Sequence, residues 1–136
     1  IEDAFPGPKT IPADLREAAQ VNRWTAFAAT EVDQLLMRNY VVEYVFHKDE
    51  DGQVVRTKID RAIKRFPRMM AMLESAVADG YLGSSEFSMA DCFLMPILNA
   101  TQLFPEGQEA VAGSPALKAY FDKVAERDSF KNTAPE

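Results

Sequence analysis

The stretch at residues 83–96 constrains the fold more than any other part of the chain. Ser88 stands where a helix N-cap is expected, and Asp91 follows three residues later. In a capping box, the side chain of each such residue accepts a hydrogen bond from the backbone amide of the other. The apolar run that follows is typical of a helix buried on most sides, whose first amides must be capped by the chain itself. We therefore predict a structural capping box at Ser88 and Asp91, at the start of the central helix.

Helical periodicity dominates the chain before this stretch. Residues 13–46 contain no Pro or Gly and repeat apolar residues at about every third or fourth position. This predicts one long helix with more than one apolar face. Residues 55–77 carry a second apolar stripe at helical spacing. Pro67 falls inside the second stripe, and we expect it to kink the helix there, with a full break as the less favoured alternative.

The remaining helices follow from turn and capping residues. We expect the central helix to continue through Pro96 and to end at Pro105 and Gly107. Ser114 as N-cap and Pro115 in the first turn start another helix, and a last short turn follows. No strand is predicted. The predicted fold class is an all-α helical bundle of about five helices.

Composition limits the classes of partner. The chain of 136 residues has a net charge of −6, which disfavours nucleic acid and anionic membranes, because both attract clustered Lys and Arg. The group Arg61, Lys64, Arg65 and Arg68 is expected to decorate a helix face, with a phosphate-binding patch as the less favoured alternative. No run reaches the ~18 apolar residues of a transmembrane helix. We expect neither nucleic acid nor membrane as a partner.

The side chains that could carry chemistry are few. One cysteine, Cys92, permits no internal disulfide, which favours a reducing cytoplasm. A helix dipole can lower the pKa of a thiol in the first turn, but the apolar neighbours of Cys92 predict an inert, buried residue. A single histidine, His47, is interpreted as a loop residue, and with one cysteine it cannot build a zinc site. We expect no metal.

Residues 81–96 resemble the capping-box segment of the cytosolic glutathione transferases. The matching pattern is Tyr81-Leu82-Gly83, a short gap, Phe87-Ser88-Met89-Ala90-Asp91 and then Pro96. In that family the segment opens the central helix of the all-helical C-terminal domain. Residues 1–8 resemble the end of the thioredoxin-like N-terminal domain; a frayed tail is the alternative. We therefore expect residues 1–11 to be the end of a preceding domain and a linker, and residues 12–136 to be a glutathione transferase C-terminal-like helical domain.

The resemblance implies a parent enzyme that transfers the thiolate of glutathione to a hydrophobic electrophile, a detoxification reaction. Glutathione would be a co-substrate bound mainly by the N-terminal domain, and no catalytic residue would lie in this chain, which is expected to be inactive alone. The resemblance also supports a homodimer of the parent. We expect its contacts in the early halves of the first two long helices, around Trp24 and Phe27.

The candidate substrate-binding residues lie on the first long helix. Leu36, Tyr40 and Tyr44 share a face at a spacing of four, and Met37 adjoins it. In glutathione transferases the far half of this helix lines the pocket for the hydrophobic electrophile, so the resemblance implies that role here. The alternative is that these side chains pack against the linker and the final helices.

A second function of the same fold stays open. Similar helical domains occur as non-catalytic protein-interaction modules in translation factors and aminoacyl-tRNA synthetases. The sequence that precedes residue 1 in the parent would discriminate between the two functions, because a thioredoxin-like pattern there would favour the enzyme.

Overall fold

A continuous helical run from Leu15 to Phe46 forms one long side of the molecule. The structure is a computed structural model that describes residue 7 and residues 9–133. The run consists of α1 (Leu15–Phe27), a π-helical segment (Ala28–Val41) and α2 (Val42–Phe46), together called the first helix below. The predicted single long helix is confirmed.

The first helix begins at a side-chain cap. Oδ1 of Asp14 accepts hydrogen bonds from the backbone N–H groups of Arg16 (2.9 Å) and Glu17 (3.0 Å). The apolar stripe begins later than the sequence suggests, because Leu15 is 85% exposed and the first fully buried residue is Val21. The expectations for residues 1–11 fall mostly outside the described residues.

The middle of the first helix is wound more widely than an α-helix. The backbone N–H of Val42 donates to the carbonyl of Met37, five residues earlier in the chain. Hydrogen bonds from i to i+5 define the π-helix. The buried residues of this segment are Ala28, Val32, Leu35, Leu36, Tyr40 and Val41. Together they give a broad apolar face, along which the central helix packs.

The second apolar stripe contains two helices, α3 (Thr57–Ile63) and α4 (Phe66–Ala76). The expected kink at Pro67 is therefore wrong, because the helix breaks just before α4. Pro67 lies in the first turn of α4, where its missing N–H is tolerated because amides there have no acceptor within the helix. Ile59 and Phe66 are both buried, so the stripe continues across the break and hides it from a periodicity argument.

The central helix is α5 (Met89–Thr101), which contacts the first helix and α7. Pro96 lies inside α5 without ending it, as predicted. Leu94 and Leu98 are fully buried. The helix is buried on most sides, but one face is open, where Phe93 is 42% exposed and Cys92 is also exposed. Cys92 is therefore not the core thiol that its neighbours suggest.

The sequence pattern does not predict α6 (Pro105–Ala112), because Pro105 and Gly107 were expected to end a helix. Pro105 instead begins one. Gly107 lies against the C-terminal end of α5, where an added Cβ would overlap the backbone carbonyl of Thr101. These two residues mark a helix start and a tight helix-to-helix approach.

The last helices are α7 (Pro115–Ala125) and α8 (Asp128–Lys131). Ser114 occupies the N-cap position of α7 as predicted, but its hydroxyl donates to the carbonyl of Ala110 (3.0 Å). The cap comes from α4, where Oε1 of Glu74 accepts from the N–H of Ala116 (2.8 Å). A long-range contact thus replaces the local cap.

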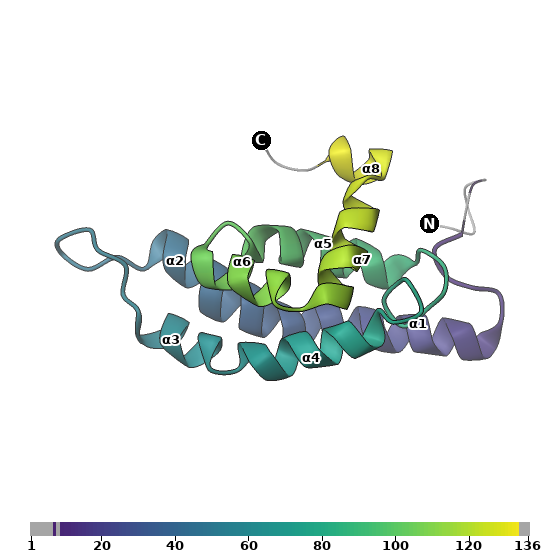
Figure 1. Ribbon diagram of the computed structural model, residues 1–136, viewed down its shortest axis with the longest axis horizontal. Helices are drawn as coiled ribbons and strands as arrows, with labels where there is room; N and C mark the ends of the chain where they lie inside the picture. Colours follow the sequence, from purple (N-terminus) through teal and green to yellow (C-terminus); the bar gives the residue numbers. More distant parts are fainter. Residues whose placement is uncertain (1–6, 8, 134–136) are drawn as a thin grey trace.

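The helices pack as an elongated bundle (Figure 1). The first helix, α4 and α5 run along the long axis, the turn before α3 projects at one end, and α7 and α8 rise across the bundle. Among the described residues there are only two isolated bridges and no strand. The predicted all-α helical bundle is confirmed.

Candidate functional site

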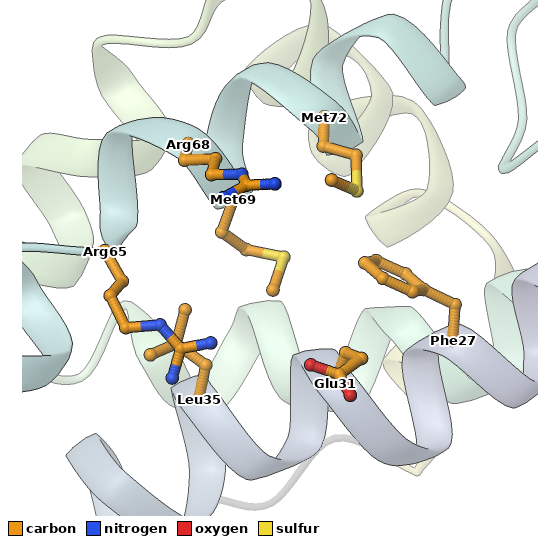
Figure 2. A pocket seen from close by; sticks show the side chains of 7 residues that line it. All are labelled: Phe27, Glu31, Leu35, Arg65, Arg68, Met69 and Met72. Carbon is orange, nitrogen blue, oxygen red and sulfur yellow. The ribbon is translucent and has the colours of Figure 1, made fainter.

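A groove of about 370 Å³ runs between the first helix and α4 (Figure 2). The residues that line it are Phe27, Glu31 and Leu35 from the first helix, and Arg65, Arg68, Met69 and Met72 in and just before α4. Phe27 and Met72 lie toward one end, and Arg65 lies near Leu35 at the other. The groove therefore combines an apolar end with a charged end.

The two walls of the groove carry side chains of opposite charge. Glu31 comes from the first helix, whereas Arg65 and Arg68 come from the opposite wall. No ion pair joins Glu31 to either arginine in the part of the chain that the structure describes. An adjoining hollow of about 300 Å³ adds Lys58 and Arg61 to the basic side. The basic residues singled out in the sequence thus largely line one wall of these hollows.

Trp24 and Phe27 differ in how far their rings are covered by the rest of the chain. Their rings pack edge to face with centroids 5.5 Å apart. Gly83, with φ of +67°, lies under Trp24, where an added Cβ would overlap the indole ring. Part of Trp24 is therefore covered by the loop before α5, whereas Phe27 lines the open groove.

The structure places the four predicted substrate-binding residues in two layers. Leu36 and Tyr40 are fully buried, and Met37 and Tyr44 are partly buried against the core. The ring of Tyr40 contacts that of Tyr44 edge to face at 5.2 Å. Tyr44 also stacks on Phe104 at 4.2 Å. Only Met37 and Tyr44 retain solvent-accessible surface of the kind that a ligand would need.

A carboxylate joins the two tyrosines to α6. Oε2 of Glu106 accepts hydrogen bonds from the hydroxyls of Tyr40 (3.1 Å) and Tyr44 (2.8 Å). Oε1 accepts from Nη2 of Arg56 (2.6 Å), whose Nη1 also donates to the Tyr44 hydroxyl (2.6 Å). The Tyr40 hydroxyl itself accepts from the N–H of Gly107 (2.9 Å). Buried phenols require such partners, but nothing in the sequence identifies a carboxylate 62 residues away as the acceptor.

These contacts set the protonation states in the cluster. Burial alone would raise the pKa of Glu106, but hydrogen bonds from Arg56, Tyr44 and Tyr40 outweigh it and hold that pKa at about 2. Burial, followed by the neighbouring carboxylate, raises the pKa of the Tyr44 hydroxyl, and burial also dominates the raised pKa of Tyr40. Neither phenol therefore ionises near neutral pH, which makes both poor bases for activating a thiol.

A capping box is present at the start of α5. The N–H of Ser88 donates to Oδ2 of Asp91 (2.8 Å), and the Ser88 hydroxyl donates to the same oxygen (3.2 Å). Oδ1 of Asp91 accepts from the N–H of Leu82 and from the hydroxyl of Tyr120, both at 2.9 Å. Sequence reasoning missed these two partners, although a buried tyrosine on α7 needs an acceptor.

The described residues contain neither a candidate metal-binding cluster nor a helix that could span a membrane. No group of three or more His, Cys, Asp or Glu side chains there could hold a metal ion. No helix in this part of the chain is both long and apolar enough to cross a membrane.

The helical arrangement and the buried capping box define a class of fold, and the comparisons with known proteins agree. The family model of the glutathione S-transferase C-terminal domain matches residues 56–123, half of the chain. The chain therefore belongs to the glutathione S-transferase C-terminal domain family. The resemblance drawn from the capping-box segment is confirmed.

Solved structures of glutathione transferases share the fold. Glutathione transferase F7 from Populus trichocarpa matches 97% of the chain with a TM-score of 0.83 and 20% identity. Glutathione S-transferase I bound with lactoylglutathione matches 89%, with a TM-score of 0.79 and 20% identity. The chain covers 62% and 57% of these two proteins. At this identity the likeness establishes the fold alone.

Curated relatives match over shorter stretches. A stringent starvation protein A homolog of Haemophilus ducreyi is 39% identical over 66 residues, which is 48% of the chain and 30% of that protein. A homolog of the same name in Pasteurella multocida is 46% identical over 50 residues, which is 37% of the chain and 23% of that protein. The chain thus matches less than a third of the length of either relative.

Proposed function

We propose that this chain is the helical domain of a glutathione transferase-like protein that transfers the thiolate of glutathione to a hydrophobic electrophile. The observation that carries the proposal is the agreement of the fold with a glutathione transferase over 97% of the chain. Family membership supports it as well. In the reaction, the thiolate sulfur forms a bond to an electrophilic carbon, and the electron pair moves onto the leaving group or acceptor atom. No metal is needed for this chemistry.

The tyrosine cluster indicates which part of the reaction this chain would perform. Tyr40 and Tyr44 donate hydrogen bonds to Glu106 and have raised pKa values, so neither is proposed to activate the thiol. By family resemblance, glutathione binds mainly to a thioredoxin-like N-terminal domain. This chain would then contribute a wall of the electrophile pocket. Met37 and Tyr44 would form its surface, and the buried Leu36 and Tyr40 would support them from behind.

The groove of Figure 2 is the proposed dimer contact. In a two-fold symmetric dimer the same patch occurs on both copies, so the patch must complement itself. Glu31 lies opposite Arg65 and Arg68, and Phe27 lies opposite Met72. Each copy therefore carries both halves of an ion pair and of an apolar contact. We propose that two parent molecules associate through this groove, in the cytoplasm, where a chain with one cysteine needs no oxidising environment.

A non-catalytic interaction module is the second candidate. The observation that favours it is that both curated relatives are named stringent starvation protein A homologs, a name that states no transferase activity. A parent of this type would use the same fold as a docking surface and would bind no electrophile.

Conjugation kinetics of the whole parent protein test the proposal. With glutathione and a chlorinated nitrobenzene, we expect saturable turnover. Met37→Ala should raise the KM for the electrophile and leave the KM for glutathione unchanged. Leu15→Ala, at an 85% exposed position at the start of the first helix, is the matched control and should leave both KM values unchanged. No turnover with a panel of electrophiles would favour the interaction module instead.

A further inference from the structure

A second groove lies on a different side of α4, where α4 meets α6. Figure 1 shows α6 beside α4, and the two helices are in contact. The groove has a volume of about 520 Å³ and reaches from the start of α4 to Ser114, the residue before α7. It shares no residue with the groove of Figure 2. None of the four predicted substrate-binding residues lines it, although Glu106 on its rim accepts hydrogen bonds from Tyr40 and Tyr44.

The floor of this α4–α6 groove is apolar. Phe66 and Met70 are each 3% exposed and form its base, with Ile63, Ala71 and Ala110 beside them. A methionine next to an aromatic ring gives a floor that can adapt to the shape of a ligand. The floor therefore suits an aliphatic or aromatic group.

The rim of the groove is acidic. It carries Glu74 from α4 and Glu106 and Glu109 from α6, and no Lys, Arg or His is among its lining residues in the described chain. Arg56 binds Glu106, and the N–H of Ala116 occupies one oxygen of Glu74. Within the part of the chain described here, the side chain of Glu109 has neither a hydrogen-bonding nor an ionic partner. The negative charge of Glu109 and much of that of Glu74 is therefore uncompensated.

From this arrangement we propose that the α4–α6 groove binds a segment of a partner protein in which a Lys or Arg stands next to a bulky apolar residue. The apolar side chain packs on Phe66 and Met70, and the cation meets Glu109 and the second oxygen of Glu74. Charge complementarity selects such a segment, because both the rim and the whole chain, with a net charge of −6, repel acidic ligands. The inference is independent of glutathione transfer.

A peptide titration followed by backbone amide NMR shifts of the 136-residue chain tests this proposal. The probe is acetyl-Leu-Arg-Phe-Ala-amide, and its control replaces Arg with citrulline, which has nearly the same shape without the charge. We expect saturable shifts confined to α4, α6 and the turn at Ser114. Affinity should fall with added salt, because salt screens exposed charges. The citrulline peptide should bind more weakly.

Two variants of the chain provide matched comparisons. Glu109→Gln removes the uncompensated charge and should weaken binding about two- to fivefold, the range of an exposed ion pair. Glu50→Gln, in the exposed turn before α3, should leave the affinity unchanged. Thermal unfolding of both variants checks that the fold is retained.

Three results would overturn the inference. One is the absence of saturable shifts in the groove, and another is equal binding of the Arg and citrulline peptides. The third is a set of groove shifts that depends on protein concentration without peptide, because a second copy of the chain would then be the occupant.

Discussion

The hydroxyl of Tyr120 donates a hydrogen bond of 2.9 Å to Oδ1 of Asp91. The same oxygen accepts from the N–H of Leu82, and the other carboxylate oxygen accepts from the N–H of Ser88. Asp91 is fully buried. One capping carboxylate therefore satisfies donors from the preceding loop, from the start of α5 and from α7.

This relationship predicts unequal effects at the two capping-box positions. Ser88→Ala should lower the free energy of unfolding by about 1–2 kcal/mol, as for a typical cap. Asp91→Ala should cost more, by roughly 1–3 kcal/mol for each buried donor left without an acceptor. The double variant should be non-additive, because the two residues share one network. Urea unfolding of the three variants measures this; equal single losses or strict additivity would contradict it.

Acid should weaken the Glu106 cluster over a defined pH range. The pKa of Glu106 is about 2 in the folded chain against an ordinary 4.5, so its stabilising effect is complete above 4.5. The effect is lost as the pH falls from about 4.5 towards 2. Glu106→Gln should therefore be less stable than the wild type at pH 7, and the gap should narrow below pH 4.5. Urea unfolding at several pH values is the measurement.

Glu109→Gln is the control for Glu106→Gln. Glu109 lies on the same helix, and its side chain has no hydrogen-bonding or ionic partner within the described chain. Glu109→Gln leaves the contacts of Glu106 in place, so its free energy of unfolding at pH 7 should stay within about 0.5 kcal/mol of the wild type. A gap for Glu106→Gln that stays constant between pH 7 and pH 3 would show that the contacts of the carboxylate do not depend on its charge.

Gly107 should tolerate no side chain. A Cβ there would overlap the carbonyl of Thr101, and backbone cannot move aside as a side-chain end can. We expect Gly107→Ala to destabilise the chain by about 3 kcal/mol, the upper end for overpacking. Gln108→Ala, at the exposed next position, should stay within about 0.5 kcal/mol of the wild type. Similar unfolding midpoints for the two variants would contradict the tight approach of α6 to α5.

The chain alone should neither bind nor conjugate glutathione. Tyr40 and Tyr44 are occupied by Glu106, and by family resemblance the glutathione site lies on a thioredoxin-like domain. Calorimetry with millimolar glutathione should show no saturable heat. A conjugation assay with a chlorinated nitrobenzene should show no turnover above the uncatalysed rate. Saturable binding or turnover by the 136-residue chain would refute this.

Phe27→Glu should weaken self-association of the parent. The substitution places a carboxylate at the apolar end of the groove, opposite Met72. Burying that charge without a partner is unfavourable, so we expect a shift towards monomer in sedimentation velocity. Thr30→Glu, at an exposed position of the first helix outside the groove, is the matched control. A wild-type parent that stays monomeric at all concentrations would exclude the dimer, whereas a monomeric isolated chain would not.

Three local features of the structure agree with the prediction from the sequence. The cap at Ser88, the helix start at Pro115 and the continuation of α5 through Pro96 each depend on a few neighbouring residues. The all-α fold follows from the helical spacing of the apolar residues. Whether Met37 and Tyr44 line an electrophile pocket stays a prediction.

Other features are visible only in the tertiary structure, because the packing of the helices decides them. The break before Pro67 leaves the apolar stripe intact, so periodicity does not reveal it. Cys92 has apolar neighbours in sequence, yet it lies on the open face of α5.

The sequence by itself determined most of the helical segments, though not α6 or the break between α3 and α4, because backbone capping and apolar spacing act within a few turns. Only the tertiary structure decided which polar groups meet. The Glu106 carboxylate is shared by Tyr40, Tyr44 and Arg56, and Asp91 is shared by Leu82 and Tyr120. Buried polar groups must find partners, but any nearby donor or acceptor can serve. Which donor pairs with which acceptor is fixed only when the helices pack, and these pairings determine the geometry of the candidate sites.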